Sequence, residues 1–363
     1  MKIQTPSRLH ITLIDLNGSY GRIDGGIGLT LADPHFILEA VPADKEITIE
    51  FTETAGGSQS ERNACINKVI AAAEKAAARY APGTGYHFTV HQLYPAHSGL
   101  GSGTQMSLAA AKLIAELSGH HPASTELAEL VGRGGTSGIG VHAFDLGGFI
   151  ADGGHSKKEK KQLHAKLRLH RQTRMSPGKI PLPRRLGRSP RRPRVRQPVQ
   201  NGAAEKNIFQ THCPVPKTDV EQVSHLVFMN LIPFLIEHDI EAFGHALDQI
   251  QAVGFNKIEM TLQPPELTSL MHNMRDAGAY GVGLSSFGPD PLHRLRSCEQ
   301  RHCRRNAGTP RRRRTRHRHP RPEPRCRTVL KPIPIDRNYP GLSCHEHTEN
   351  HRKKYSDKIQ SSQ

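Results

Sequence analysis

The sequence contains no tryptophan, and aromatic residues make up only 5% of its 363 residues. Grooves that bind single-stranded nucleic acid stack bases on aromatic side chains, so this scarcity argues against such a function. The six cysteines form no CxxC pair, no apolar run approaches the ~18 residues that a bilayer span needs, and no secretory signal follows Met1. These absences predict a cytoplasmic protein with reduced thiols, no membrane contact and no standard zinc site.

The formal charge of +17 is concentrated in two segments. Residues 157–196 and 290–363 hold 36 of the 50 Lys and Arg residues but only 8 of the 33 acidic residues, which leaves an ordinary acidic remainder. Both segments are rich in Arg and Pro and lack an apolar period, so we expect them to be disordered. We therefore predict a first domain over 1–156, an anomalous basic segment over 157–203, a second domain over 204–289, and a basic tail over 290–363.

The remaining residues alternate between strand and helix patterns, which favours an α+β fold. In the first domain we expect strands over 8–16, 28–31, 47–52 and 86–91, and helices over 61–80, 106–117 and 125–131. Ser124 or Thr125 is the expected cap of the last helix, and residues 22–26 are expected to form a ligand-facing loop. In the second domain the patterns predict helices over 220–238, 242–253 and 265–277. A strand and loop over 278–289 follow, and we expect this segment to return to the ligand bound by the first domain.

The glycine-rich run 95–105 follows a predicted strand and precedes an apolar helix. Its glycines allow the backbone to approach a ligand closely, and the helix directs unpaired N–H groups and its positive dipole end toward the loop. A plain glycine-rich turn is the alternative, but the hydroxyl side chains of Ser102 and Thr104 lie among and beside these glycines. We predict a phosphate or pyrophosphate site formed by Gly99, Leu100, Gly101, Ser102, Gly103 and Thr104.

Two further glycine clusters lie over 133–140 and 147–155. Together with Pro6-Ser7-Arg8-Leu9-His10, the run 95–105 and residues 207–211, they resemble the GHMP kinase superfamily, and within it the beta-ribofuranosylaminobenzene 5'-phosphate synthases. The resemblance implies a GHMP-kinase-like two-domain fold, with a ribosomal-protein-S5-domain-2-like N-terminal domain and a ferredoxin-like C-terminal domain. It also implies a pentosyltransferase of methanopterin biosynthesis that acts with Mg²⁺ and as a homodimer.

The implied reaction condenses phosphoribosyl pyrophosphate with 4-hydroxybenzoate or 4-aminobenzoate and releases pyrophosphate and CO2. Arg8 or Arg133 would hold the benzoate carboxylate or the ribose phosphate, because a guanidinium forks onto such anions. The other assigned side chains are His10 and His155 for proton transfer, Asp24 and Asp152 for Mg²⁺ or ribose hydroxyls, and Thr136 and Ser137 for substrate binding. For each histidine, a structural hydrogen-bonding role is an equal alternative, and Ser285 and Ser286 are expected to cap a loop.

Residues 161–203 and all residues after Pro289 depart from this resemblance. Our hypothesis is that both stretches are translated out of frame, which resequencing would test, and we expect the chain as written to be impaired. Two other functions stay open. One is a small-molecule kinase of the same superfamily that uses ATP, and the other is a nucleic-acid-binding protein that acts through its Arg-rich segments.

Overall fold

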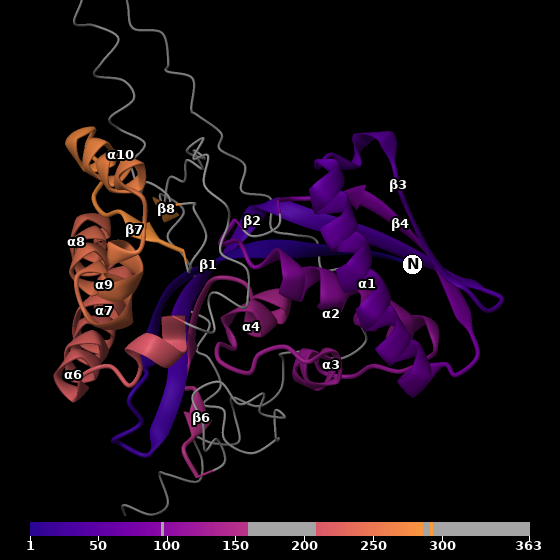
Figure 1. The fold of residues 1–363 in the computed structure, drawn as a ribbon, viewed down its shortest axis with the longest axis horizontal. Helices are drawn as coiled ribbons and strands as arrows, with labels where there is room; N and C mark the ends of the chain where they lie inside the picture. Colours follow the sequence, from indigo (N-terminus) through magenta and orange to yellow (C-terminus); the bar gives the residue numbers. More distant parts are fainter. Residues whose placement is uncertain (96–97, 159–207, 286–290, 293–363) are drawn as a thin grey trace, which may run out of the picture. The chain divides into compact units, whose positions relative to one another are not determined.

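The computed structural model describes residues 1–95, 98–158, 208–285 and 291–292 (Figure 1). The two Arg- and Pro-rich segments lie almost wholly outside these ranges. Their predicted disorder, the frame-error hypothesis and the expected role of Ser286 therefore concern residues that are not described. Within the described ranges, every helix is too short or too polar to span a bilayer.

The N-terminal half is built on a sheet of six strands with the core order β1-β2-β4-β3, while β5 and β6 also pair with β2. The strands are β1 (Lys2–Asp15), β2 (Arg22–Ala43), β3 (Ile47–Phe51), β4 (Gly85–Gln92), β5 (Phe149–Asp152) and β6 (His155–Ser156). Only β3 and β4 run parallel; the other pairs are antiparallel. The strands expected at 8–16, 47–52 and 86–91 are confirmed.

Strand β2 is much longer than its predicted core at 28–31, and the ligand-facing loop expected at 22–26 is wrong because β2 begins at Arg22. The glycines that suggested a loop are there because neighbouring chain segments lie very close. A Cβ on Gly28 would stand 2.4 Å from Cγ2 of Ile139, and one on Gly25 would stand 2.8 Å from the carbonyl oxygen of Asp152. Pairing on both edges holds residues 26–29 in the sheet, whereas Asp24 and Gly25 have φ values of +67° and +69° within the strand.

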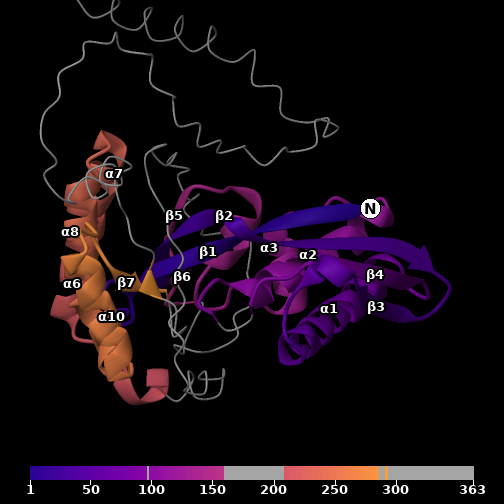
Figure 2. The same ribbon diagram turned by 90° about the horizontal axis from the view of Figure 1, so that it is seen from above.

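Helices pack on one face of the sheet, with α1 and α2 side by side (Figures 1 and 2). The helical segments of this half are η1 (Glu53–Ala55), α1 (Gln59–Tyr80), α2 (Ser102–Leu117), α3 (Ser124–Val131) and α4 (Ile139–Asp145). Buried alanines on α1 and α2 let the two helices approach closely. The predicted cap of α3 is wrong, because Ala123 occupies the N-cap position and no side chain caps the helix.

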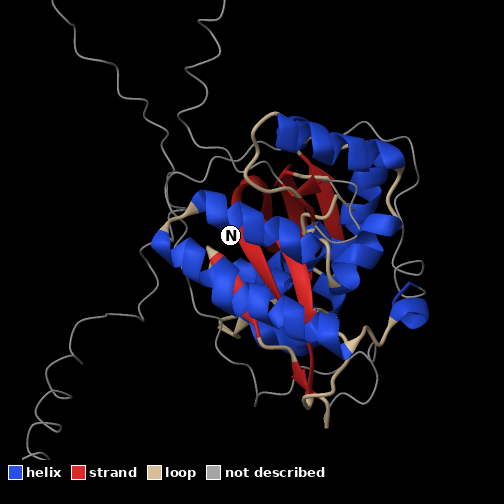
Figure 3. Ribbon diagram, turned by 90° about the vertical axis from the view of Figure 1, so that its left-hand side faces the viewer, coloured by secondary structure: helices blue, strands red, loops and turns tan. Residues whose placement is uncertain are grey.

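The C-terminal half is mostly helical (Figure 3). It contains α6 (Lys217–His225), η2 (Leu226–Leu231), α7 (Ile232–Glu237), α8 (Ile240–Gln251), α9 (Gly254–Thr261), α10 (Pro265–Asp276) and the paired strands β7 (Gly283–Leu284) and β8 (Pro291–Leu292). The predicted helix over 220–238 corresponds to α6, η2 and α7, which follow one another without a break. The helices expected at 242–253 and 265–277 are confirmed as α8 and α10, whereas α9 was not predicted.

Strand β1 joins the two halves, since its second part contacts the C-terminal helices. The side-chain amide of Asn256 donates to the carbonyl of Ile11 over 2.9 Å and accepts from Thr12 Oγ1, also over 2.9 Å. Leu16 packs with Phe209 and Phe255, whose rings stack at 4.5 Å. These contacts show that residues at and just after the end of β1 pack against the C-terminal half. The domain division at 156 and 204 stays a prediction.

Candidate functional site

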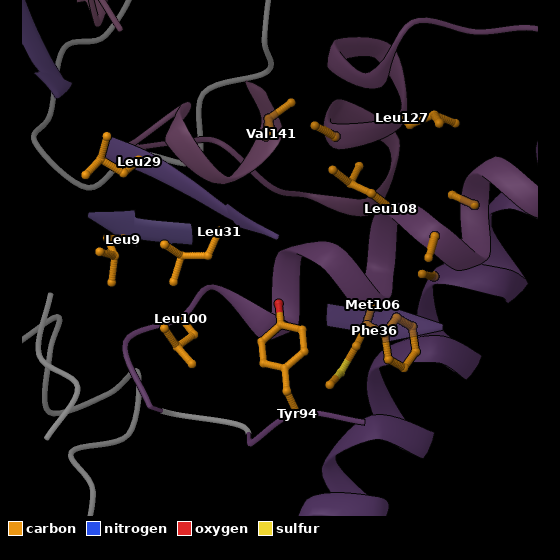
Figure 4. Close-up of a cluster of buried hydrophobic side chains, with 14 of the residues drawn as sticks. Leu9, Leu29, Leu31, Phe36, Tyr94, Leu100, Met106, Leu108, Leu127 and Val141 are labelled. Carbon is orange, nitrogen blue, oxygen red and sulfur yellow. The ribbon is translucent and has the colours of Figure 1, made fainter. Parts of the chain in front are cut away.

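The glycine-rich loop between β4 and α2 is anchored to the protein core through Leu100. Leu100 is buried in the main hydrophobic cluster, which also contains Tyr94 (Figure 4). Its carbonyl oxygen accepts a 3.0 Å hydrogen bond from the backbone N–H of Arg8 on β1. Gly99 and Gly101 both have a φ of +76°, which favours glycine, so the loop can turn back on itself on either side of Leu100.

The loop carbonyl of Gly99 is also held by the protein. It accepts hydrogen bonds from Nη1 of Arg8 over 2.6 Å and from Oγ of Ser285 over 2.7 Å. Ser285, fully buried, follows β7, so the described end of the 278–289 segment contacts this loop, while its predicted return to the ligand stays a prediction. The Arg8 guanidinium, expected to bind a substrate anion, thus has Nη1 engaged by the loop.

The amides of the same loop are not engaged. In the described part of the chain, no acceptor receives a hydrogen bond from the N–H groups of Gly99 to Gly103, whereas Thr104 and Gln105 donate to the carbonyl of Gly101 over 3.2 and 3.4 Å. Because these amides precede or begin α2, they share its positive dipole end. Among the described residues, the loop therefore bonds its carbonyls to the protein and leaves these N–H groups without an acceptor.

Two cationic side chains stand beside these donors. Nη2 of Arg133 lies 2.9 Å from the point that a Cβ on Gly103 would occupy, and Cε of Lys68 on α1 lies 3.8 Å from the same point. The nearby charge of Arg133 lowers the pKa of Lys68, and burial lowers the pKa of Arg133. Arg133 was predicted as a site residue. Lys68 was not, because one lysine in an alanine-rich helix gives no signal in the sequence.

His10 contacts the loop indirectly. Its backbone N–H donates to Oγ of Ser285 over 3.0 Å, and its buried Nε2 has no hydrogen-bond partner among the described residues. Burial, assisted by the charge of Arg8, lowers the pKa of His10 to about 3. The imidazole is therefore neutral at physiological pH, which suits a hydrogen-bonding group better than a proton acceptor.

A second group of predicted residues gathers where β2 meets β5 and β6. Asp24, with a φ of +67°, and His155 form a buried pair with 2.9 Å between Oδ2 and Nδ1. Both oxygens of Asp152 accept backbone N–H groups, from Gly138 over 2.6 Å and from Gly154 over 3.1 Å. This arrangement favours a structural role for Asp152, which fixes the turn ahead of α4.

The loop over 133–138 connects the two groups, since it begins with Arg133 and ends at the amide that Asp152 holds. Ser137 Oγ accepts from the N–H of Ile139 over 3.3 Å, and Thr136 lies beside it in the loop. Among the residues described, no three His, Cys, Asp or Glu side chains are grouped to hold a metal ion. With Asp152 bonded to amides, these residues do not fit a protein-held Mg²⁺.

Comparison with known proteins places this geometry in a family. Residues 67–151, which include the glycine loop and α2, match the family "GHMP kinases N terminal domain". The chain is 44% identical over 287 residues to the beta-ribofuranosylphenol 5'-phosphate synthase of Methanothermobacter thermautotrophicus, covering 79% of this chain and 86% of that protein. It is 39% identical over 308 residues to the synthase of the same name from Methanocaldococcus jannaschii, covering 80% and 88%.

Solved structures agree at the level of the fold. The L. major mevalonate kinase in complex with R-mevalonate superposes with a TM-score of 0.56 at 16% identity and covers 83% of this chain and 89% of its own. The likeness shows a GHMP-kinase-like α+β fold, and the identity to the synthases is high enough to go further. The chain belongs to the beta-ribofuranosylphenol 5'-phosphate synthase family of the GHMP kinase superfamily.

Proposed function

We propose that this chain is a pentosyltransferase that joins phosphoribosyl pyrophosphate to 4-hydroxybenzoate and releases pyrophosphate and CO2, a step of methanopterin biosynthesis. The name of its relatives specifies a ribofuranosylphenol 5'-phosphate as the product. A phenol product retains the hydroxyl of 4-hydroxybenzoate, so that name favours this substrate over 4-aminobenzoate. It also disfavours the ATP-dependent kinase that the superfamily alone would suggest.

The chemistry needs a site that stabilises a departing anion. The bond between C1 of the ribose and the pyrophosphate oxygen breaks, and the oxygen keeps the electron pair. The ring carbon that bears the carboxylate attacks C1, and loss of CO2 returns an electron pair to the ring and restores its aromaticity. Because the carboxylate is the group lost from that carbon, no ring proton has to be removed, which is consistent with a neutral His10.

One observation carries the proposal: the amides of Gly99 to Gly103 have no acceptor in the described part of the chain. Donors that are oriented before the reaction stabilise charge as it develops on the leaving group. Arg133 is the better candidate for a substrate anion, since Nη1 of Arg8 already binds Gly99. In the described ranges no three His, Cys, Asp or Glu side chains are grouped to hold a metal ion, so the Mg²⁺ that the resemblance implies would be held by the pyrophosphate oxygens.

The test is incubation of the full chain with phosphoribosyl pyrophosphate, Mg²⁺ and 4-hydroxybenzoate labelled at its carboxyl carbon. We expect labelled CO2 only when all three are present, and none when ATP replaces phosphoribosyl pyrophosphate. A frame-corrected chain assayed in parallel separates an impaired sequence from a wrong reaction. Absence of labelled CO2 from both chains would refute the proposal. The homodimer and the cytoplasmic location stay predictions.

A further inference from the structure

We propose that Lys68 and Arg133 form a binding pair for the diphosphate group, placed beside the glycine-loop amides that have no acceptor among the described residues. The inference rests on the proposed function for the identity of the substrate. It assigns to Lys68, a residue of α1, a direct contact with the pyrophosphate before and after that group leaves C1.

The first step is the position of the two cations. Arg133 Nη2 and Lys68 Cε approach one point, the missing Cβ of Gly103, at 2.9 and 3.8 Å. They come from different parts of the chain, Lys68 from the middle of α1 and Arg133 from the turn after α3. Gly103 lies in the first turn of α2, so both cations stand next to the unpaired N–H groups of that helix.

The second step is that this positive charge is not compensated within the described residues. No carboxylate there forms an ion pair with Lys68 or Arg133, although lysines elsewhere, such as Lys112 with Glu116, have such partners. Two like charges at short range repel, and the helix dipole adds to the repulsion. The two side chains nevertheless lie together beside Gly103 and do not turn away from each other, to solvent or to an acidic side chain. An anion bound between them would remove the repulsion.

The third step identifies the anion. The donors form two adjacent sets, the amides of Gly99 to Gly103 on one side and the two cations beside Gly103 on the other. A diphosphate presents two linked phosphoryl groups and can occupy both sets at once, whereas a monophosphate occupies one. Cationic donors form the shorter and stronger charge-assisted hydrogen bonds with phosphoryl oxygens.

The experiment is calorimetric titration of the full chain with inorganic pyrophosphate and, separately, with inorganic phosphate, at fixed ionic strength and without Mg²⁺. The variants are Lys68→Gln and Arg133→Gln, with Lys75→Gln as the matched control. Lys75 lies two turns further along α1 and is exposed, as Lys68 is, but unlike Lys68 it is not among the nearest neighbours of the Gly103 Cβ position. Because Arg133 is partly buried, Arg133→Lys is added, and Lys68→Gln remains decisive if Arg133→Gln does not fold.

We expect Lys68→Gln and Arg133→Gln to weaken pyrophosphate binding about ten- to a hundredfold, as loss of a hydrogen bond to a charged group does. Phosphate binding should weaken less, and Lys75→Gln should bind both anions as the parent chain does. The proposal is overturned if Lys68→Gln binds pyrophosphate unchanged, if both anions weaken equally, or if the parent chain does not bind pyrophosphate. Normal pyrophosphate binding with no release of labelled CO2 would instead keep the pair and refute the proposed reaction.

Discussion

Arg8 and Gly99 are 91 residues apart in the sequence, and a 2.6 Å hydrogen bond joins the guanidinium of one to the carbonyl oxygen of the other. The backbone N–H of Arg8 also binds the next carbonyl, that of Leu100. One residue of β1 thus holds two successive carbonyls of the glycine loop, and within the described ranges the N–H groups of Gly99 to Gly103 have no acceptor. The orientation of the loop depends on this contact.

We therefore expect Arg8→Gln to weaken pyrophosphate binding, although Arg8 need not touch the ligand. A loop that loses its charged anchor can reorient its amides, and the cost should be about 1–3 kcal/mol in the free energy of unfolding. Urea unfolding and calorimetric titration measure the two effects. Arg62→Gln is the control, because Arg62 also donates to a loop carbonyl, that of Gly56 over 3.2 Å, but at an exposed position. Unchanged pyrophosphate binding in Arg8→Gln would show that the loop holds its shape without the anchor.

Ser285→Ala should destabilise the protein even though it removes a single atom. The Ser285 hydroxyl donates to Gly99 and accepts from the N–H of His10, so its loss leaves that buried N–H without its acceptor. We expect a loss of about 1–3 kcal/mol in the free energy of unfolding. The control is Ser224→Ala, whose hydroxyl bonds only the carbonyl of Val220 in its own helix. Equal effects of the two substitutions would contradict a special role for Ser285.

Much of the fold was predictable because the repeat of apolar residues that marks a helix or a strand lies within a single segment of the sequence. The alanine-rich pattern of α1 and the alternation of β1 follow directly from the sequence. The full length of β2 did not, since Gly25, Gly26 and Gly28 interrupt the alternation and the strand is held by neighbours on both edges. Helix α4 was not predicted either, because its first residues belong to a glycine cluster that gives no helical pattern. Its packing against β2 is visible only in the fold.

The site divides in the same way. The glycine loop was predictable because its glycines, its preceding strand and its following helix are adjacent in the sequence. The position of Lys68 beside this loop was not, since helical periodicity predicts which face of a helix a side chain lies on but not which other segment packs opposite that face. Arg8 shows a further limit: the sequence does not reveal that Nη1 of its guanidinium binds the carbonyl of Gly99, and its contact with a substrate anion stays a prediction.

His10 should make stability depend on pH. Its pKa is about 3 in the folded protein, because of burial and then the charge of Arg8, against about 6.5 for an exposed histidine. Between these values the unfolded chain binds a proton that the folded chain does not, so acid favours unfolding. The contribution is complete above pH 6.5 and is lost as the pH falls toward 3, by about 1.4 kcal/mol for each pH unit in that window.

The measurement is urea unfolding of the parent chain and of His10→Gln at pH 7, 6, 5 and 4. Groups that titrate in both chains cancel in the difference, which isolates His10. We expect the parent chain to lose stability relative to His10→Gln as the pH falls. A difference that stays constant over this range would mean that the folded protein can protonate His10 at no cost.

Gly99→Ala and Gly103→Ala should separate folding from binding. At Gly99, where φ is +76°, a Cβ would stand 2.3 Å from the carbonyl oxygen of Ser285, and neither backbone can yield easily. At Gly103 the backbone is helical, and the atom in the way is the end of the flexible Arg133 side chain, 2.9 Å from the Cβ position. Alanine in a helix is favoured over glycine by up to about 1 kcal/mol.

Gly99→Ala should therefore lower the melting temperature of the protein. Gly103→Ala should melt at or above the temperature of the parent chain, but it should bind pyrophosphate more weakly because Arg133 is displaced. Tight pyrophosphate binding by a stable Gly103→Ala chain would mean that Arg133 does not need its present position beside the loop.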